Sequence, residues 1–223
     1  MKKTARIAGL VFAAIAVTDT LFLAAGNETV PAYIKPFLIP SLAVAVLCAL
    51  LPEHKERLTA LLVTGMAFHT AGDILLEFSD RDFLYFALGL GCFFAGHIFY
   101  LCVLCHGLKL KGGIEMLVFA APLVIAPFAA ASFGMEFPMS AALTVYALAL
   151  LFITASGVVW ALRRRPFSWR IAAGGLTFIF SDILVAVNAF SGTDFPFRHA
   201  IVIATYLAAE WLLVSTMTRW IKQ

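Results

Sequence analysis

The sequence contains eight long apolar segments, and this pattern limits the fold more than any other feature. The segments cover approximately residues 6–25, 33–51, 58–77, 83–106, 113–132, 138–162, 168–190 and 199–220. A helix needs about 17–25 apolar residues to cross the hydrocarbon core of a bilayer. Only 13% of the residues are charged and 62% are hydrophobic, which is far from the composition of soluble domains. We therefore predict an all-α integral membrane protein, an eight-transmembrane-helix bundle.

The first apolar segment resembles a secretory signal peptide, because basic residues precede it and small residues follow it. Its apolar part is longer than in such a peptide, and Asp19 interrupts it. We therefore interpret it as a retained first span. The connections are short and contain turn residues, among them Gly26, Pro52 and Gly192. No connection is long enough for a second domain, so residues 1–223 are expected to form a single transmembrane domain.

Lysine and arginine are distributed very unevenly between the two sides of the predicted bundle. Only Lys35, Arg81 and Arg198 lie on one side, and the other 13 of the 16 basic residues share the opposite side. Since basic residues accumulate in cytoplasmic loops, both termini are predicted to be cytoplasmic. In a bacterium this multi-pass protein would reside in the inner membrane. No basic groove with interleaved aromatic residues is present, so no nucleic acid is expected as a partner.

Two parts of the chain repeat a short pattern. The sequence reads GDIL around Asp73 and SDIL around Asp182. The apolar segments that follow read FFAGHIFYL and YLAAEWLLV, which aligns His97 with Glu210. Both aspartate helices are predicted to run from the cytoplasm outwards, so the pattern is compatible with a parallel four-plus-four repeat.

Several polar residues interrupt the apolar segments, although a charged side chain at the centre of a bilayer costs roughly 2.5–3.5 kcal/mol. They are Asp19, Lys35, His69, Asp73, Glu77, His97, Asp182, Asn188 and Glu210. At 1.5 Å of rise per residue, Asp19, Asp73 and Asp182 each lie roughly 20 Å from the cytoplasmic face. We expect these side chains to converge on a shared, hydrated cavity rather than to face lipid.

Simple structural roles are available for part of this set. Asp19 can pair with Lys35 across the first two helices, Glu77 can lie at the membrane interface, and His69 can be a core packing residue. Two aspartates at a similar depth, Asp73 and Asp182, are more than the packing of one small bundle requires. Two carboxyl groups in an apolar pocket can divide the work of catalysis, one acting as a protonated general acid and the other as an ionised base. A serine hydrolase is not indicated, because the G-x-S-x-G motif is missing from the sequence.

A metal site is the alternative interpretation of the same residues. His69 and Asp73 are four residues apart on one helix face, and His97, Asp182 and Glu210 could complete a hydrolytic zinc site. The usual H-x-x-x-H and H-E-x-x-H motifs are missing, so no metal is expected. Residues 102–106 read CVLCH, which matches a haem-attachment pattern. Their predicted place at the cytoplasmic end of a helix argues against haem, so no cofactor is expected.

Taken together, these motifs resemble the YhhN family of bacterial and animal membrane proteins, the lysoplasmalogenases. The resemblance covers nearly the whole chain and rests on five short matches: Lys35-Pro36, Gly72-Asp73, Gly96-His97-Ile-Phe-Tyr100, Ser181-Asp182-Ile-Leu with Asn188, and Tyr206-Leu-Ala-Ala-Glu210. One departure is that the family favours glutamine where Glu210 stands. That difference adds a titratable group.

The resemblance implies hydrolysis of the vinyl ether bond of lysoplasmalogens. Asp73 and Asp182 would then share the acid and base roles, with neither role assigned to either residue. The substrate would be a lysophospholipid within the bilayer, bound with the help of five residues: Lys35 at the phosphate, and His97, Asn188, Tyr206 and Glu210 in the surrounding hydrogen-bond network. Two other functions stay open at this point. One is a small transporter or lipid-binding protein with an acidic midplane site, and the other is a metal-dependent lipid hydrolase.

Overall fold

The computed structural model describes residues 2–53, 55–191, 193 and 195–223, so the predicted turn residue Gly192 lies outside the described residues. Within these ranges the chain forms eight α-helices and one short 3₁₀ helix: α1 (Lys2–Ala24), α2 (Thr29–Leu50), η1 (Leu51–Glu53), α3 (Glu56–Leu76), α4 (Phe83–Leu104), α5 (Gly113–Ala131), α6 (Met139–Leu162), α7 (Ser168–Ser191) and α8 (Arg198–Ile221). Each of the eight α-helices is long and apolar enough to cross a membrane. The prediction of an all-α, eight-helix, multi-pass membrane protein is confirmed.

The helix boundaries differ from the predicted ones by a few residues, and the difference at α2 matters for the site. This helix begins at Thr29 rather than at residue 33. The side-chain oxygen of Asn27 accepts a hydrogen bond from the backbone N–H of Val30 at 3.1 Å. Pro31 fits the first turn of the helix, where its missing N–H has no helical partner. Lys35, expected at the opening of this helix, therefore lies almost two turns inside it.

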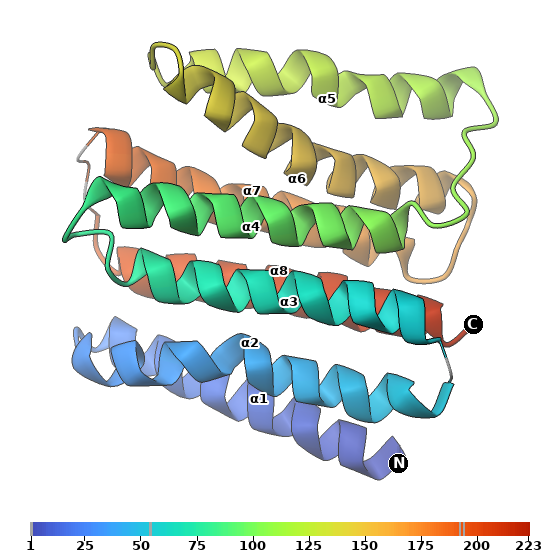
Figure 1. Ribbon diagram of the computed structural model, residues 1–223, viewed down its shortest axis with the longest axis horizontal. Helices are drawn as coiled ribbons and strands as arrows, with labels where there is room; N and C mark the ends of the chain where they lie inside the picture. Colours follow the sequence, from blue (N-terminus) through green and yellow to red (C-terminus); the bar gives the residue numbers. More distant parts are fainter. Residues whose placement is uncertain (1, 54, 192, 194) are drawn as a thin grey trace.

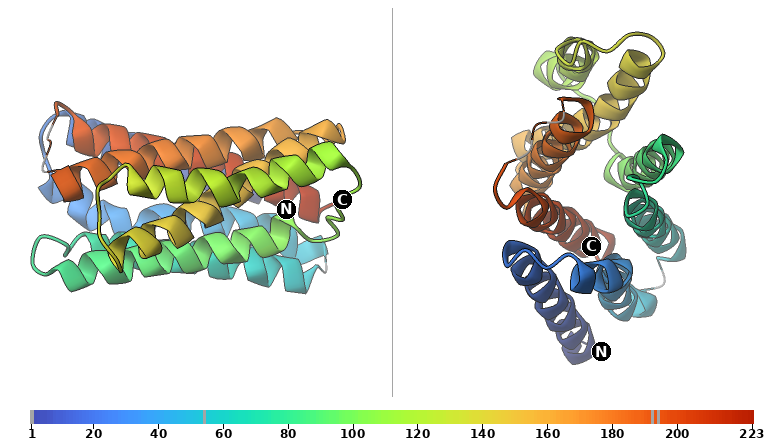
Figure 2. Two further views of the ribbon diagram at one scale, coloured as in Figure 1. Left: turned by 90° about the horizontal axis from the view of Figure 1, so that it is seen from above. Right: turned by 90° about the vertical axis from the view of Figure 1, so that its left-hand side faces the viewer.

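All eight helices run roughly along the long axis of the molecule, and the two termini lie at the same end (Figure 1). Consecutive helices pack against each other, except for α4 and α5, and further contacts join α4 to α6 and α8 to α1, α2 and α3. The end-on view in Figure 2 shows α3 and α4 on one side of the bundle and α7 and α8 on the other. The pairs α1–α2 and α5–α6 lie at opposite ends of this arrangement. The two aspartate helices, α3 and α7, thus belong to the facing pairs.

Glycines allow α3 and α4 to approach closely, as small residues often do between membrane helices. A Cβ atom added at Gly96 would lie 2.2 Å from Cδ2 of His69 and 2.9 Å from the carbonyl oxygen of Gly65. A Cβ atom added at Gly72 would lie 2.7 Å from the Phe93 ring. This close contact places the His69 ring directly against the backbone of α4.

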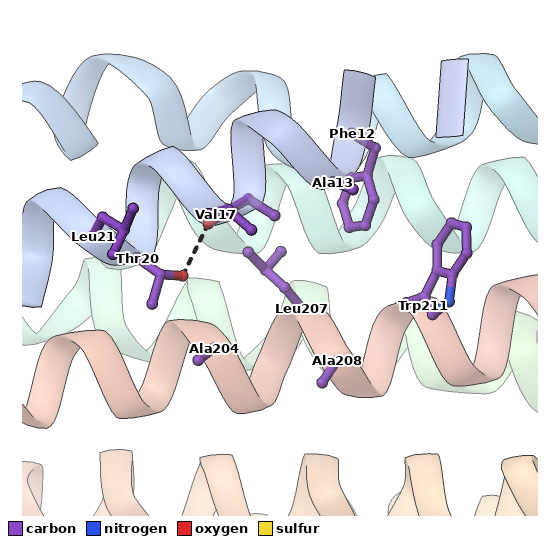
Figure 3. A pocket seen from close by; sticks show the side chains of 10 residues that line it. Phe12, Ala13, Val17, Thr20, Leu21, Ala204, Leu207, Ala208 and Trp211 are labelled. Carbon is purple, nitrogen blue, oxygen red and sulfur yellow. Dashed lines mark hydrogen bonds between the residues drawn. The ribbon is translucent and has the colours of Figure 1, made fainter. Parts of the chain in front are cut away.

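A shallow groove of about 430 Å³ lies between α1 and α8 (Figure 3). The rings of Phe12 and Trp211 stack across it with their centroids 5.9 Å apart. The hydroxyl of Thr20 donates a hydrogen bond to the carbonyl of Ala16 at 2.9 Å, so it is already satisfied within its own helix. None of the ten lining residues is titratable. The groove therefore offers an apolar surface and no group suited to catalysis.

Candidate active site

A cavity of about 870 Å³ lies in the interior, and residues from all eight helices line it. Its volume is within the range of about 300–1,000 Å³ that is usual for ligand sites. Glu28, Asp80 and Arg198 are among the lining residues. These residues lie at the α1–α2, α3–α4 and α7–α8 connections, so the cavity extends to the end of the molecule opposite the two termini.

The cavity is lined by charged side chains on one flank and mainly by apolar side chains on the opposite flank. On the flank formed by α1, α2 and the C-terminal end of α3, the cavity is lined by the charged residues Asp19, Lys35 and Glu77. On the flank formed by α5 and α6, the lining is apolar apart from Tyr146: Ile125, Ala129, Ala130, Leu143, Ala147, Leu150 and Leu151. The cavity is therefore amphipathic, and its polarity matches a molecule with one charged end and one apolar end.

Asp73 and Asp182 both line this cavity, between its charged and apolar flanks. Asp73 is 3% exposed, and its Oδ2 accepts a hydrogen bond from the Tyr206 hydroxyl at 2.9 Å. Asp182 is half-buried, and its Oδ2 accepts a hydrogen bond from the Tyr146 hydroxyl at 2.7 Å. Each carboxyl group therefore has its own tyrosine, and each tyrosine comes from a different helix, α8 or α6.

Behind the cavity wall, Glu210 is the centre of a second polar cluster. One carboxyl oxygen, Oε1, lies 2.5 Å from Nδ1 of His69, and the other, Oε2, accepts a hydrogen bond from the Tyr100 hydroxyl at 2.7 Å. All three side chains are fully buried. His69 precedes Asp73 by one helical turn, and Glu210 follows Tyr206 by one turn. The contacts Asp73–Tyr206 and His69–Glu210 are thus successive polar links between α3 and α8.

This cluster changes the interpretation of three residues. His69, expected to be only a packing residue, is a hydrogen-bond partner of Glu210. His97 and Glu210, predicted to bind substrate, are fully buried and are not among the residues that line the cavity. They belong to a layer that supports the cavity wall, because their helices direct them toward the interface between α3, α4 and α8.

His97 has an unusual environment for a polar side chain. It is fully buried, and within the described part of the chain neither ring nitrogen has a hydrogen-bond partner. Its ring contacts are with the rings of Phe178 at 4.6 Å, His69 at 4.8 Å and Tyr146 at 5.7 Å between centroids. His97 therefore packs against residues near both aspartates: His69, one turn before Asp73, and Tyr146, the hydrogen-bond partner of Asp182.

The expected pair between Asp19 and Lys35 is wrong. Lys35 donates a hydrogen bond from Nζ to Oε2 of Glu77 at 3.1 Å. Glu77 is 37% exposed, whereas Asp19 is fully buried. A long lysine side chain keeps its ammonium group near water where it can, and the more hydrated carboxylate is Glu77. Both oxygens of Asp19 are left without a hydrogen-bond partner among the described residues.

Asn188 also lines the cavity, as its predicted role in binding requires. Its side-chain amide donates a hydrogen bond to the carbonyl of Thr193 at 3.5 Å. Asn188 is six residues beyond Asp182 on α7 and therefore lies nearer the end of the molecule that holds the α7–α8 connection.

Sequence reasoning missed Tyr146 and Tyr100, which contact Asp182 and Glu210. A tyrosine in an apolar segment carries no sign of which carboxylate its hydroxyl will reach, so the sequence offered no signal for either contact. Within the described residues, no three His, Cys, Asp or Glu side chains are arranged so that they could hold a metal ion. The site as built is a pair of aspartates with tyrosine donors in an amphipathic cavity.

Comparison with known proteins gives one informative result. Neither the curated proteins nor the solved structures yield a match to this chain. The model of the YhhN family matches residues 30–217, a range that begins at the start of α2 and reaches the last turn of α8. It includes Asp73, Asp182 and both of their tyrosine partners. On this match, which covers most of the sequence and both aspartate–tyrosine pairs, the chain belongs to the YhhN family.

Proposed function

We propose that the protein hydrolyses the vinyl ether bond of lysoplasmalogens, releasing a fatty aldehyde and a glycerophosphoethanolamine or glycerophosphocholine. Its membership of the YhhN family supports a lysoplasmalogenase-like hydrolase. The observation that carries the proposal is that Asp73 and Asp182 line one cavity between a charged flank and an apolar flank. A lysoplasmalogen has its vinyl ether at the same kind of boundary, between a phosphate headgroup and a long hydrocarbon chain.

The two flanks of the cavity define how such a lipid would bind. The alkenyl chain would occupy the apolar flank of α5 and α6, and the headgroup would occupy the flank that contains Lys35. The Lys35 ammonium would meet the phosphate, which competes with Glu77 for the same donor. This orientation brings the vinyl ether to the part of the cavity that Asp73 and Asp182 line.

The chemistry needs one protonated and one ionised carboxyl group. The carboxylic acid delivers its proton to the β carbon of the vinyl ether, where the electrons of the C=C bond form the new C–H bond. The resulting oxocarbenium ion is attacked by water, while the second carboxylate removes a proton from that water. The carboxyl group that took a proton from water then gives it to the glycerol oxygen, and the C–O bond breaks to release a hydroxyl group. The carboxylate that delivered the first proton removes the hemiacetal O–H proton, so the aldehyde forms and both carboxyl groups return to their starting states. One water molecule is consumed, and no proton is gained or lost.

The tyrosines fix the orientation of the two carboxyl groups in this scheme. Tyr206 and Tyr146 donate to Oδ2 of Asp73 and Asp182, respectively. Proton transfer would then use Oδ1 of each aspartate. A carboxylate held in one orientation loses less entropy when the transition state forms, which is a general advantage of preorganised sites.

The proposal is tested by measuring aldehyde release from a lysoplasmalogen by the detergent-purified protein. Replacing Asp73 or Asp182 with asparagine should lower turnover by roughly 10²–10⁴-fold, the usual contribution of a general acid or base. Glu136→Gln is a matched control, because Glu136 is exposed in the α5–α6 connection and does not line the cavity. Thermal unfolding of each variant checks that it is folded.

Three results would contradict the proposal. Near-normal turnover in Asp73→Asn or Asp182→Asn would remove that residue from catalysis. Aldehyde release that a chelator abolishes would favour a metal-dependent hydrolase instead. No aldehyde release by the wild-type protein would favour lipid binding or transport as the function of the cavity.

A further inference from the structure

Asp19, on the charged flank of the cavity, is a carboxylate that the proposed reaction does not use. It is fully buried in α1, lines the cavity, and has no hydrogen-bond partner for either oxygen among the described residues. Burial of a carboxyl group without hydrogen bonds is costly. A buried carboxyl group without hydrogen bonds is expected where a bound ligand supplies the missing donor.

The neighbouring charges indicate which part of a ligand Asp19 would contact. Lys35 is the cation on this flank, and it lies beside Glu77 at 3.1 Å from Nζ to Oε2. If a phosphate binds Lys35, Glu77 loses its partner, and the flank then contains two carboxylates, Asp19 and Glu77. A cationic group next to the phosphate would satisfy both of them. The headgroup of an ethanolamine or choline lipid carries such a cation two carbons beyond the phosphate.

We infer that Asp19, together with Glu77, binds the ammonium group of the lipid headgroup next to a phosphate held by Lys35, and that this site prefers a primary ammonium to a trimethylammonium. The inference rests on the proposed function, because it takes the phospholipid as the occupant of the cavity. It adds a residue outside the two catalytic aspartates, and it names the feature of the headgroup that the site selects.

The preference for a primary ammonium follows from the side chains around Asp19. An ethanolamine ammonium has three N–H donors, which can satisfy the unpartnered oxygens of Asp19. A choline headgroup has no N–H donor, and proteins usually recognise it with the faces of aromatic rings. The cavity residues that α1, α2 and α3 place on this flank are Leu23, Pro31, Ala32 and Leu76 in addition to the charged ones, and none of them is aromatic.

The test compares three substrates that differ only in the headgroup: alkenyl-glycerophosphoethanolamine, alkenyl-glycerophosphocholine and alkenyl-glycerophosphate. Wild-type protein should show the lowest KM with the ethanolamine lipid. Asp19→Asn keeps the size of the side chain and should raise the KM for the ethanolamine lipid about tenfold, with kcat almost unchanged. The KM for alkenyl-glycerophosphate, which has no ammonium, should be the same in variant and wild type. Glu136→Gln serves again as the surface-charge control.

Two outcomes would overturn the inference. One is an equal rise in KM for all three lipids, which would mean that Asp19 shapes the cavity and does not recognise the ammonium. The other is an unchanged KM for the ethanolamine lipid in Asp19→Asn.

A binding measurement separates this inference from the proposed reaction. Lysophospholipids with a saturated ether at the same position have no vinyl group to protonate, so they bind without being hydrolysed. If wild-type protein releases no aldehyde from any lipid, the proposed reaction is wrong, and the binding of these analogues still tests the headgroup site. Asp19→Asn should weaken binding of the ethanolamine analogue about tenfold and leave the phosphate analogue unaffected. Equal binding of the ethanolamine analogue by variant and wild type would overturn the inference.

Discussion

The α3–α4 pair and the α7–α8 pair share one close glycine contact, although the buried side chains around it differ in chemistry. Aligning the two aspartates pairs Gly65 with Gly174 and Asp73 with Asp182. A second alignment, of the helices that follow, pairs His97 with Glu210 and Tyr100 with Leu213. A Cβ atom added at Gly65 would lie 2.7 Å from Tyr100, and one added at Gly174 would lie 2.9 Å from Leu213. This pair of glycines therefore meets equivalent neighbours, which is compatible with the four-plus-four repeat that the sequence pattern allows.

The contacts that cross between the two pairs show where the halves diverge. His69 corresponds to Phe178 in the alignment of the two aspartate helices. His69 lies 2.5 Å from Glu210 through a hydrogen bond, whereas Phe178 meets His97 with ring centroids 4.6 Å apart. The two contacts occupy equivalent places in the two halves. The first joins two polar side chains, His69 and Glu210, and the second joins the polar side chain of His97 to the apolar ring of Phe178. His97 has no hydrogen-bond partner because a phenylalanine occupies the place that would supply one. Equivalent positions in a repeat thus need not have equivalent roles.

The first prediction tests this difference through stability. Replacing His69 with leucine leaves Glu210 buried with one partner fewer, and breaking a buried pair in this way costs about 3 kcal/mol of unfolding free energy. Replacing His97 with leucine removes a side chain that has no hydrogen bond and should change the unfolding free energy by less than about 1 kcal/mol. Denaturant-induced unfolding of the purified variants in mixed micelles measures both values. Equal losses would contradict the distinction between the two histidines.

The second prediction concerns the packing within the first pair. In the second pair, an alanine, Ala209, corresponds to Gly96. Replacing Gly96 with alanine should destabilise the protein by about 2 kcal/mol, because the new Cβ would press on the His69 ring and on a backbone carbonyl. Gly91→Ala is the matched control in the same helix, because a Cβ atom there would have no neighbour within 4 Å. The same unfolding experiment applies, and a Gly96→Ala variant as stable as Gly91→Ala would refute the tight contact.

The third prediction compares the two tyrosines. Tyr206→Phe and Tyr146→Phe each remove one hydrogen bond to a carboxylate and leave the ring in place. A hydrogen bond to the ionised carboxylate contributes about 1.5–3 kcal/mol and one to the protonated carboxyl group about 0.5–1.5 kcal/mol. One variant should therefore lower kcat at least about tenfold, and the other by about two- to tenfold. Aldehyde release at saturating substrate is the measurement. A normal kcat in one variant alone would show that only one of the two aspartates depends on its tyrosine for orientation.

The sequence was sufficient for the fold and for placing two aspartates within apolar helices, because both depend on composition along one helix. The catalytic role of Asp73 and Asp182 stays a prediction. An apolar run of about 20 residues predicts a span, and an aspartate within such a run is costly wherever the helix packs. The partners of those residues depend instead on how neighbouring helices are rotated. The sequence could not show that Lys35 would reach Glu77 rather than Asp19, or that Tyr146 on α6 would contact Asp182.

The smallest expected effect is at Glu210, where the resemblance of this chain to its family leads us to expect glutamine. A glutamine has the same shape, its amide oxygen can accept the hydrogen bond from Tyr100, and its amide NH₂ can donate to an unprotonated Nδ1 of His69. Glu210→Gln should therefore change kcat by less than about threefold, an effect below 1 kcal/mol. Glu210→Leu is the contrast, because it removes both hydrogen bonds and leaves His69 and Tyr100 buried without this partner. If Glu210→Gln lowers kcat as much as Glu210→Leu does, the charge of Glu210 itself is required, and a glutamine cannot take its place beside His69 and Tyr100.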